Sequence, residues 1–384
     1  MSDPTQPAYV YVSRQGPLDA LTRQVEGAVR VAIDTEANSL YRYRERVCLI
    51  QLSVDGDNHL VDPLARLDLT GFMNALAGKP LIFHGADYDL RMMRSSFGFR
   101  PGGWVFDTMI AAQLVGYEQV GLASLVERFF GVTLSKGAQK SDWTRRPLPA
   151  RELAYAAADT RYLPELAELL REELQHLGRL GWHEEACERL IEATAEDNHR
   201  DPETEWRVKG VSRLDRQQLV FARQLWYWRE REAERADLPP FKIVGNEQLV
   251  SWAVWAAAHP GESLEQGPRL PRTCSGRRLR ELERAIREAQ QRPQADWPQR
   301  RVRRPAERSA PDCRPLTDAL VEECARVAGS LHLPPSVIAP RAALTALSRA
   351  RPHTLEQLME SGPLMRWQAE LLAPGFRELL QREW

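Results

Sequence analysis

Residues 28–62 carry the pattern that most restricts the fold of this chain. Three short runs rich in Val, Ile and Leu, namely VRVAID, RVCLIQLSV and NHLVD, are separated by polar, turn-forming stretches. Such runs predict β-strands, and strands that follow one another this closely are expected to be antiparallel. From about residue 68 to residue 178, helical and strand patterns alternate and then become helical. The order predicts a sheet that begins as a meander and continues in α/β units.

The length of the chain and a change of pattern after residue 200 indicate several domains. At ~100–200 residues per domain, a chain of 384 residues corresponds to two to four domains. Beyond residue 200 the strand pattern disappears. Two segments, at 234–253 and 329–348, both place an L-P-P step before a helix, which indicates two copies of one helical module. Between them, residues 292–315 hold seven arginines against three acidic residues and predict an extended basic connector.

Composition excludes several classes of protein. The hydrophobic fraction of 43% and the charged fraction of 27% are typical of globular chains, and a formal net charge of -1 does not point to a nucleic-acid or membrane partner. Five scattered cysteines without a CxxC pair argue against a disulfide framework and against a zinc site. The chain shows no secretory signal pattern and no stretch near ~18 apolar residues. We therefore expect a soluble, cytoplasmic protein.

The first predicted strand ends in two carboxylates, Asp34 and Glu36, within the sequence VAIDTEANSL. Side chains two residues apart on a strand lie on the same face, roughly 6–7 Å apart, so the two acids can share one ligand. A buried, ionised carboxylate needs such a partner, because its removal from water is costly. The alternative is that the strand ends here and both acids are solvated.

Two further segments place acids on defined faces. In LAYAAADTRYL, Tyr155 and Asp159 are four residues apart and share one face of a helix, and the three alanines between them allow another surface to approach closely. In HGADYDLRMM, Asp87 and Asp89 lie at a strand-to-helix junction, where either could simply favour the helix dipole. For Asp107, which precedes TMIAAQLVG, a helix N-cap is the preferred interpretation.

Three motifs in this order resemble those of the ribonuclease D family of DEDD-type 3′→5′ exonucleases, in the subgroup whose third motif contains Tyr. The first motif is IDTEANSL, the second is HGADYDL, and the third is Y-x-x-x-D from Tyr155 to Asp159. The register of the family's second motif selects Asp89 over Asp87. The resemblance continues in FDTMIAAQLVG, GLASLVERFFGV and KGAQKSDWTRRPL, and the two L-P-P modules look like HRDC domains. It thus spans nearly the whole chain.

The resemblance implies an α/β fold of the ribonuclease H-like kind, with a mixed sheet flanked by helices, followed by two small all-α domains of the HRDC type. It implies four regions: an exonuclease domain at 1–200, a first HRDC-like domain at 207–290, a Pro- and Arg-rich linker at 291–315, and a second, degenerate HRDC-like domain at 316–384. The protein is expected to act as a monomer on RNA with a free 3′ end.

The resemblance also supplies catalytic roles. The four carboxylates are expected to bind two divalent metal ions, Mg²⁺ or Mn²⁺, which prefer oxygen ligands. Asp34 bridges both ions in this assignment, Glu36 and Asp159 bind the ion nearer the attacking water, and Asp89 supports the second ion. Tyr155 is expected to orient the water, since a phenol with an ordinary pKa near 10 is a poor base at neutral pH.

Two basic and aromatic segments predict a path for single-stranded nucleic acid. The sequence ANSLYRYRER after the first motif alternates Tyr with Arg, and such side chains stack on bases and bind phosphates. The alternative for ANSLYRYRER is that its aromatic side chains pack at the edge of a strand. The second segment is KSDWTRRPL, in which Trp143 could pack against the sheet. His84 receives no catalytic role, because this subgroup uses Tyr where its sister subgroup uses His. The residues expected to contact nucleic acid are Asn38, Tyr41, Arg44, His84, Lys140, Trp143 and Arg145.

The implied function is that of a metal-dependent 3′→5′ exoribonuclease that trims structured RNA precursors such as tRNA and releases nucleoside 5′-monophosphates. Two alternatives stay open: a DNA 3′→5′ exonuclease of the same superfamily, and a non-catalytic RNA-binding protein on a nuclease scaffold. The intact set of four carboxylates and one Tyr argues against the second. No membrane partner is expected, because no stretch approaches ~18 apolar residues. No nucleotide cofactor is expected, because Gly78 and Lys79 precede a proline and lack the spacing of a phosphate-binding loop.

Overall fold

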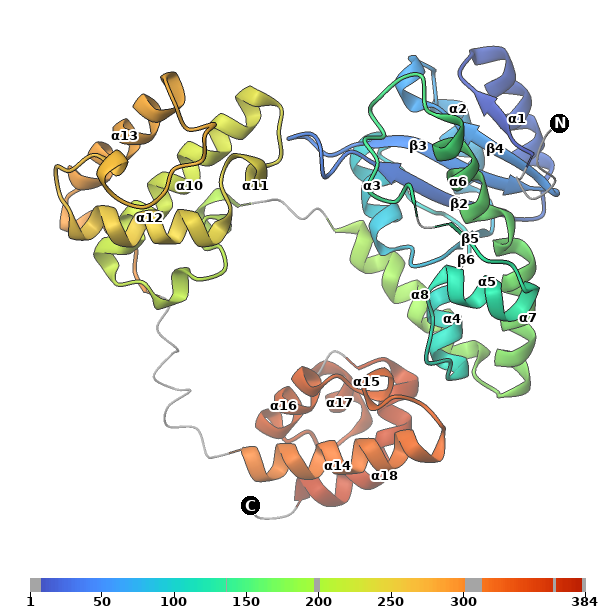
Figure 1. Cartoon of the computed structure of the whole chain (residues 1–384). Helices are drawn as coiled ribbons and strands as arrows, with labels where there is room; N and C mark the ends of the chain where they lie inside the picture. The colour runs from blue at the N-terminus through green and yellow to red at the C-terminus, as the bar shows by residue number, and fades with distance from the viewer. Residues whose placement is uncertain (1–7, 136, 197–200, 301–312, 362–363, 382–384) are drawn as a thin grey trace. The chain divides into compact units, whose positions relative to one another are not determined.

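Figure 1 shows the computed structural model of the chain. Its residues divide into two compact units. One unit comprises residues 1–37, 46–196 and 310–384, and the other comprises residues 38–45 and 197–309. The structure describes residues 8–135, 137–196, 201–300, 313–361 and 364–381. Residues 301–312, within the predicted Pro- and Arg-rich linker, lie outside the described residues.

A six-stranded mixed sheet forms the centre of the first unit (Figure 1). Its strands are β1 Val10–Val12, β2 Val31–Ala37, β3 Val47–Val54, β4 Asp57–Val61, β5 Leu81–Phe83 and β6 Val105–Asp107. The spatial order is β1-β4-β3-β2-β5-β6. Antiparallel pairing joins β2 to β3 and β3 to β4, whereas the other three pairs are parallel. The predicted meander, with its α/β continuation, is confirmed.

Helices cover both faces of this sheet. They are α1 Gln15–Gly27, α2 Thr70–Ala77, α3 Asp87–Phe97, α4 Thr108–Val115, α5 Leu122–Phe130, α6 Ala150–Arg161, α7 Leu163–His176 and α8 Leu180–Ala195. Ile33 of β2 packs in one apolar cluster with α1, α2 and α3. Ala32 of the same strand packs in another cluster with α4, α5 and α7. Consecutive residues of β2 therefore face helices on opposite sides of the sheet, as the two-residue period of a strand requires.

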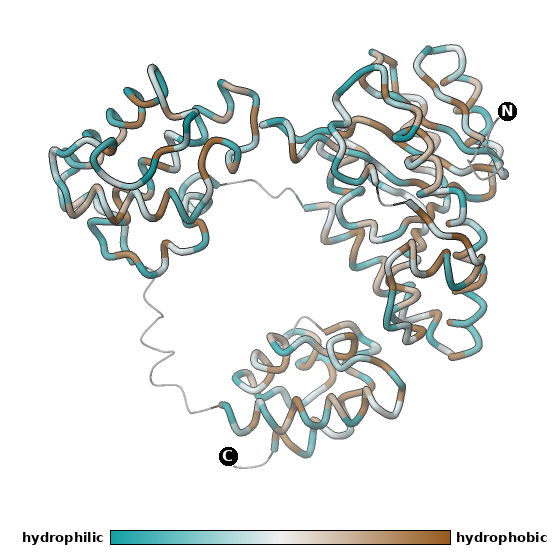
Figure 2. Tube along the Cα trace, viewed as in Figure 1, coloured by the Kyte–Doolittle hydropathy of each residue, from teal (hydrophilic) through white to brown (hydrophobic). Residues whose placement is uncertain are grey.

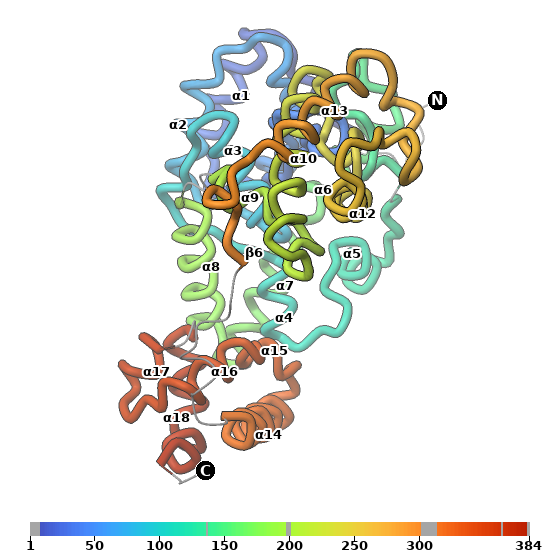
Figure 3. The backbone as a smooth tube through the Cα atoms, turned by 90° about the vertical axis from the view of Figure 1, so that its left-hand side faces the viewer, coloured from blue at the N-terminus to red at the C-terminus, as the bar shows by residue number. Residues whose placement is uncertain are grey.

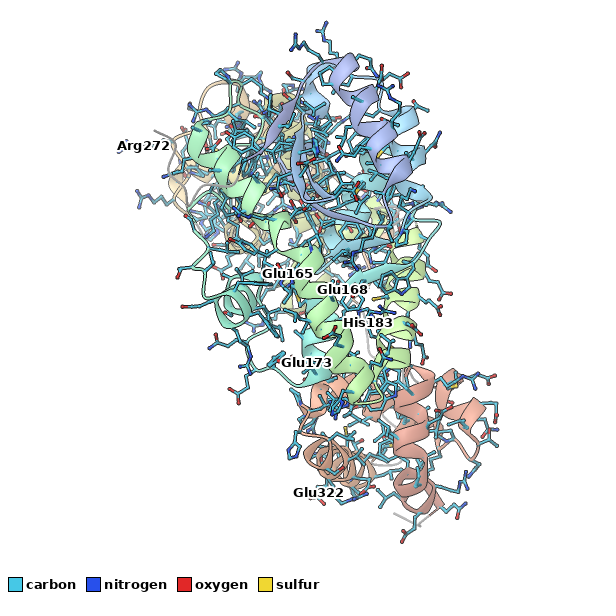
Figure 4. All side chains as sticks on the ribbon, turned by 90° about the vertical axis from the view of Figure 1, so that its right-hand side faces the viewer. Glu165, Glu168, Glu173, His183, Arg272 and Glu322 are labelled. Atoms are coloured by element: carbon cyan, nitrogen blue, oxygen red, sulfur yellow. The ribbon has the colours of Figure 1, made fainter. Side chains whose placement is uncertain are left out.

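Polar contacts fix the helices beside the sheet. Figure 4 labels Glu168 and Glu173, which lie along α7, and His183, which comes from α8. Glu168 forms an ion pair with Arg30, just before β2. The Nε2 of His183 donates a hydrogen bond to the backbone oxygen of Asp107 at 3.1 Å, and burial lowers the pKa of this imidazole. The neutral ring thus ties α8 to the end of β6.

The second unit is helical over its described residues beyond position 200. Its helices are α9 Pro202–Glu205, α10 Arg216–Ala236, α11 Pro240–Ile243, α12 Asn246–Ala258 and α13 Arg277–Gln290. Trp206, Trp228 and Trp252 are buried in one apolar cluster, and Trp297 packs against it. The first part of the predicted connector, around Trp297, is therefore packed on this unit rather than extended. Figure 2 shows hydrophobic and hydrophilic residues alternating along the helices, as expected for helices with one buried face.

The C-terminal helices repeat the arrangement of α10 to α12. They are α14 Arg314–Ser330, α15 Pro335–Ile338, α16 Arg341–Ala350, α17 Leu355–Ser361 and α18 Arg366–Gln381, and they gather into one cluster (Figure 3). Asp237 and His332, which directly precede the two L-P-P steps, both adopt a positive φ, of 49° and 54°. A short helix and then a longer one follow in both copies, which confirms the predicted repeat.

The predicted fold class is confirmed by this arrangement of a mixed sheet flanked by helices and followed by all-α modules. In the part of the chain that the structure describes, none of the helices has the length and apolar character that crossing a membrane requires.

Candidate active site

Asp34 and Glu36 leave β2 on the same face, near the C-terminal end of the strand. Asp34 lies opposite Gln51 in the antiparallel pair with β3, and Glu36 lies opposite Leu49. The pairing becomes irregular directly after Glu36, between Glu36 and Ala37. Irregularities of this kind end the regular ladder and change the direction of nearby side chains. The two carboxylates therefore lie at the end of the regular pairing between β2 and β3.

Helix α6 supplies Tyr155 and Asp159. It packs against the sheet through Ala156 and Ala157, which are both buried together with Leu49 of β3. These small side chains allow the backbone of α6 to approach the strands closely. As a result, one carboxylate oxygen from each of Asp34, Glu36 and Asp159 lies within 4.8 Å of the others. The first and third motifs thus meet at one point, although they are more than a hundred residues apart in sequence.

Asp89 approaches from the first turn of α3. Asp89 is only 6% exposed. The Oδ1 atom accepts hydrogen bonds from the backbone nitrogen of Thr35 at 3.0 Å and from its hydroxyl at 2.6 Å. Thr35 lies between Asp34 and Glu36, so these bonds hold Asp89 directly beside the two carboxylates of β2. Asp87, in contrast, is exposed and forms an ion pair with Arg91 at 3.0 Å.

Asp107 holds the loop that leads into α3. As predicted, it caps α4, because its Oδ1 accepts hydrogen bonds from the nitrogens of Met109 at 2.8 Å and Ile110 at 3.2 Å. The same carboxylate also accepts bonds from the nitrogens of Gly85 at 3.0 Å and Ala86 at 2.8 Å. Gly85 has a φ of +78°, which favours glycine at this turn. Asp107 is thus a structural residue that fixes the start of the helix bearing Asp89.

Burial raises the pKa of all four carboxyl groups, and repulsion between neighbouring carboxylates adds to it for Asp34, Glu36 and Asp89. Burial is the main cause for Asp34, followed by the charge of Asp159, and its pKa lies well above the ordinary value. Burial and then the charge of Asp34 raise the pKa of Glu36 to about 10. Burial raises the pKa of Asp159 to about 7. Burial, with the neighbouring Asp34, also raises the pKa of Asp89. The cluster therefore concentrates more negative charge than the protein alone can hold at neutral pH.

The donor set fits a hard divalent cation. All of its candidate ligand atoms are carboxylate oxygens, which Mg²⁺ and Mn²⁺ prefer, and a bound cation reverses the electrostatic cost of crowding them. Across the described residues, Asp34, Glu36 and Asp159 are the one group of acidic, histidine or cysteine side chains close enough to hold an ion together. Asp89, held by Thr35 at the same strand, can serve a second ion.

The hydroxyl of Tyr155 stays protonated in this environment. Burial raises its pKa, and so do the charges of Asp159, Glu36 and Asp34, in that order. Its ring lies beside the buried Trp143, with the ring centroids 6.3 Å apart. A protonated phenol held at this position can donate or accept a hydrogen bond but is a weak base.

Comparison with known proteins agrees with this geometry. A family model described as a 3'-5' exonuclease matches residues 9–175, and an HRDC domain model matches residues 218–255. The ribonuclease D of Granulibacter bethesdensis is 33% identical over 297 residues, which cover 76% of this chain and 74% of that protein. The chain belongs to the ribonuclease D family. The ribonuclease D of Zymomonas mobilis is 35% identical over 248 residues, 63% of either chain.

Solved structures of the ribonuclease D kind agree with the fold. The crystal structure of Escherichia coli RNase D, described as an exoribonuclease involved in structured RNA processing, matches with a TM-score of 0.73 and 26% identity. That match covers 97% of this chain and 99% of the other. By sequence, the chain spans less than two thirds of the length of the relatives from Zymomonas mobilis, Acidiphilium cryptum and Sphingobium indicum.

The loop after the first motif of this ribonuclease D family member belongs to the second unit. Asn38 is 1% exposed, and its Nδ2 donates a hydrogen bond to the backbone oxygen of Arg44 at 3.2 Å. The ammonium of Lys242 lies 4.2 Å from the centre of the Tyr41 ring. The guanidinium of Arg44 pairs with Glu234 at 3.0 Å. Tyr41 and Arg44 of this loop therefore contact other side chains of the protein. The role of the loop in RNA binding stays a prediction.

The other predicted RNA contacts divide into buried and exposed side chains. Trp143 is 1% exposed and packs in the apolar cluster under α6, which is the packing alternative considered for it. The Nδ1 of His84 is hydrogen-bonded to the Thr108 hydroxyl at 2.9 Å, and burial lowers the pKa of the ring. Lys140 and Arg145 are exposed. Of these four, only the two cations are exposed, and contact of any of the four with nucleic acid stays a prediction.

Three polar residues of the site escaped the sequence analysis. Thr35 positions Asp89 by the two hydrogen bonds described above. Glu152 of α6 is 8% exposed, its buried Oε2 has no hydrogen-bond partner among the described residues, and its charge contributes to the raised pKa of Glu36. Gln51, opposite Asp34, is fully buried, and neither of its amide atoms has a partner in the described part of the chain. The signal for Glu152 was present, since it lies three residues before Tyr155 on the same helical face.

Proposed function

We propose that this protein is a metal-dependent 3′→5′ exoribonuclease. The observation that carries the proposal is the convergence of three carboxylates from β2 and α6 within 4.8 Å, with Asp89 fixed beside them by Thr35. Oxygen donors in this number and at this spacing suit divalent ions that act on phosphodiesters. Membership of the ribonuclease D family supports the same activity.

The proposed ligands are the four carboxylates. Asp34 would bridge two ions, Glu36 and Asp159 would hold the ion on the side of the attacking water, and Asp89 would hold the other. When bound, such ions lower the pKa of a water molecule and stabilise negative charge on the leaving 3′ oxygen. Tyr155 would orient the water by a hydrogen bond, because its hydroxyl stays protonated near neutral pH. The products are nucleoside 5′-monophosphates.

The proposed substrate is the 3′ end of structured RNA, such as a tRNA precursor. Support comes from the Escherichia coli relative, which is described as an exoribonuclease involved in structured RNA processing. We further propose that the protein acts in the cytoplasm as a monomer. The proposed division of labour places catalysis in residues 1–200 and substrate binding in the first helical module at 207–290. The linker at 291–315 joins it to the second, degenerate module at 316–384.

A time course on 5′-labelled tRNA precursor tests the proposal. Wild-type protein with Mg²⁺ or Mn²⁺ should shorten the RNA stepwise from its 3′ end, and EDTA or a blocked 3′ end should stop it. Asp34→Asn should abolish shortening and leave RNA binding nearly intact. Unchanged activity in Asp34→Asn, or cleavage of a circular RNA, would refute the assignment. Faster loss of a DNA oligomer than of RNA with the same sequence would favour a DNA exonuclease instead.

A further inference from the structure

A cavity of about 300 Å³ opens in the second unit, away from the candidate active site in sequence. Its lining comes from the segment between α9 and α10, from the start of α10 and from Arg300. The lining residues are Arg207, Val208, Lys209, Gly210, Val211, Ser212, Leu214, Leu219 and Arg300. A cavity of this size is at the lower end of the range for small-molecule sites, ~300–1,000 Å³. It therefore suits one nucleotide rather than a whole duplex or a bare ion.

The local backbone explains why the cavity exists. Gly210 adopts a φ of 105°, a conformation that other residues rarely accept, and turns the chain between Lys209 and Val211. Arg207 lies over the ring of the buried Trp206, with its guanidinium carbon 4.4 Å from the ring centre. The same guanidinium donates a hydrogen bond to the backbone oxygen of Gln299 at 3.0 Å. This bond holds Gln299 beside Arg207, and the next residue, Arg300, also lines the cavity.

The charge of the lining is positive only. Three cationic side chains line the cavity and no carboxylate does. Among the described residues, neither Lys209 nor Arg300 has an ion-pair partner, and both are exposed. Other arginines of this unit are neutralised, as Arg223 is by Glu203 at 2.7 Å. Uncompensated positive charge around a concave site attracts anions, and the field is strongest inside the concavity.

The rest of the lining is aliphatic. Val211, Leu214 and Leu219 are buried side chains that form the apolar wall. A ligand that satisfies both parts of the lining has an anionic group and a flat or apolar body. A phosphate-linked nucleotide has this combination, with its phosphate for the cations and its base or ribose for the aliphatic wall.

We propose that this cavity binds one internal nucleotide of the RNA substrate, with the phosphodiester against Lys209 and Arg300. The inference rests on the proposed function for the identity of the ligand. It assigns to the first helical module a defined contact with the RNA chain upstream of the 3′ end. A dinucleotide held by its 3′ end has no further nucleotide to place in the cavity.

The test compares two double charge reversals in the full-length protein. Lys209→Glu with Arg300→Glu changes the cavity, and Arg213→Glu with Arg231→Glu changes two exposed arginines that do not line it. Binding of a fluorescent single-stranded RNA of ~20 nucleotides is followed by anisotropy in EDTA at several salt concentrations. We expect the cavity variant to bind about tenfold more weakly than the control variant. Its salt slope should fall by ~0.7, because the one phosphodiester bound in the cavity contributes ~0.7 for a single strand.

Four outcomes decide between these possibilities. Equal affinities for RNA in the cavity variant and the control variant would overturn the inference. Tight binding of a free nucleoside 5′-monophosphate, lost in the cavity variant, would assign the cavity to mononucleotides and would also overturn it. Hydrolysis of a dinucleotide with Mg²⁺ should be the same in wild type and the cavity variant. A wild type that binds RNA through the cavity but never degrades it would refute the proposed function and leave the inference standing.

Discussion

Removal of one carboxylate from the candidate site should stabilise the metal-free protein. The pKa of Asp159 rises from its ordinary value of 3.8 to about 7 on folding, because the group is buried. At ~1.4 kcal/mol for each pKa unit, this rise corresponds to a penalty of about 4 kcal/mol when the carboxylate is ionised. That figure is a ceiling, since the structure can relax around the charge. We expect Asp159→Asn to gain at least ~1 kcal/mol at pH 8 without metal.

The stability that Asp159→Asn gains over wild type should increase as pH rises. Well below pH 3.8 the group is protonated in both the folded and the unfolded state, so the wild type bears no penalty. Between the unfolded pKa of 3.8 and the folded pKa of about 7, the folded state retains a proton that the unfolded state has lost, and stability falls as pH rises. The difference between wild type and Asp159→Asn should therefore be small at pH 4 and complete at pH 8.

Calorimetry with and without Mg²⁺ measures both effects. Mg²⁺ should shift the unfolding transition of the nuclease unit, because a ligand stabilises the folded state that binds it. At a hundred times the dissociation constant, the free energy of unfolding rises by ~2.7 kcal/mol. Mg²⁺ should stabilise wild type more than Asp159→Asn. Asp87→Asn is the matched control, because Asp87 is exposed and lies outside the cluster. An Asp159→Asn protein that is no more stable than wild type at pH 8 in EDTA would refute the reasoning.

Two further substitutions test the residues that surround the carboxylates. Thr35→Ala removes the hydroxyl that donates to Asp89 at 2.6 Å. It should lower activity or metal affinity by ~10–100-fold, whereas Thr35→Ser should retain most of both, and equal steady-state kinetics for the two variants would contradict the positioning role. Glu152→Gln removes a charge that raises the pKa of Glu36. The rising limb of the pH profile should therefore move to lower pH by ~0.5 unit, and a limb that does not move would exclude an electrostatic role for Glu152.

The sheet and the carboxylates could be predicted from the sequence, because both have strong local patterns. Apolar runs separated by turns predict the β2 to β4 meander, and a period of two places Asp34 and Glu36 on one face. The four-residue spacing of Tyr155 and Asp159 places them on one face of α6. What brings the two elements together is the close packing of Ala156 and its neighbours on β3, a long-range contact that only the resemblance to ribonuclease D implied.

The features that escaped the sequence analysis depend on contacts between distant segments. The strand β1 is three residues long and pairs with β4 in parallel, and so short a run has no periodicity to detect. Tyr41 and Trp143 have the composition of RNA-binding residues, yet one lies under Lys242 and the other is buried under α6. An aromatic residue beside arginines is equally suited to stacking on a base and to packing in a core. Only the three-dimensional neighbours distinguish the two uses.

The crowded carboxylates also bear on which group controls the pH dependence of catalysis. Without metal, the raised pKa values of Glu36, about 10, and Asp159, about 7, mean that protons occupy part of the site at neutral pH. A divalent ion must displace these protons, so its apparent affinity falls as pH falls. At limiting Mg²⁺, activity should therefore rise with pH, and a tenfold increase in Mg²⁺ should move that limb to lower pH by ~1 unit if binding displaces one proton and by ~0.5 unit if it displaces two. The raised pKa of Tyr155 excludes it as the group that loses this proton near neutral pH. A rising limb at the same pH for both Mg²⁺ concentrations would contradict the competition between protons and metal, and would point to a base that titrates independently of the ions.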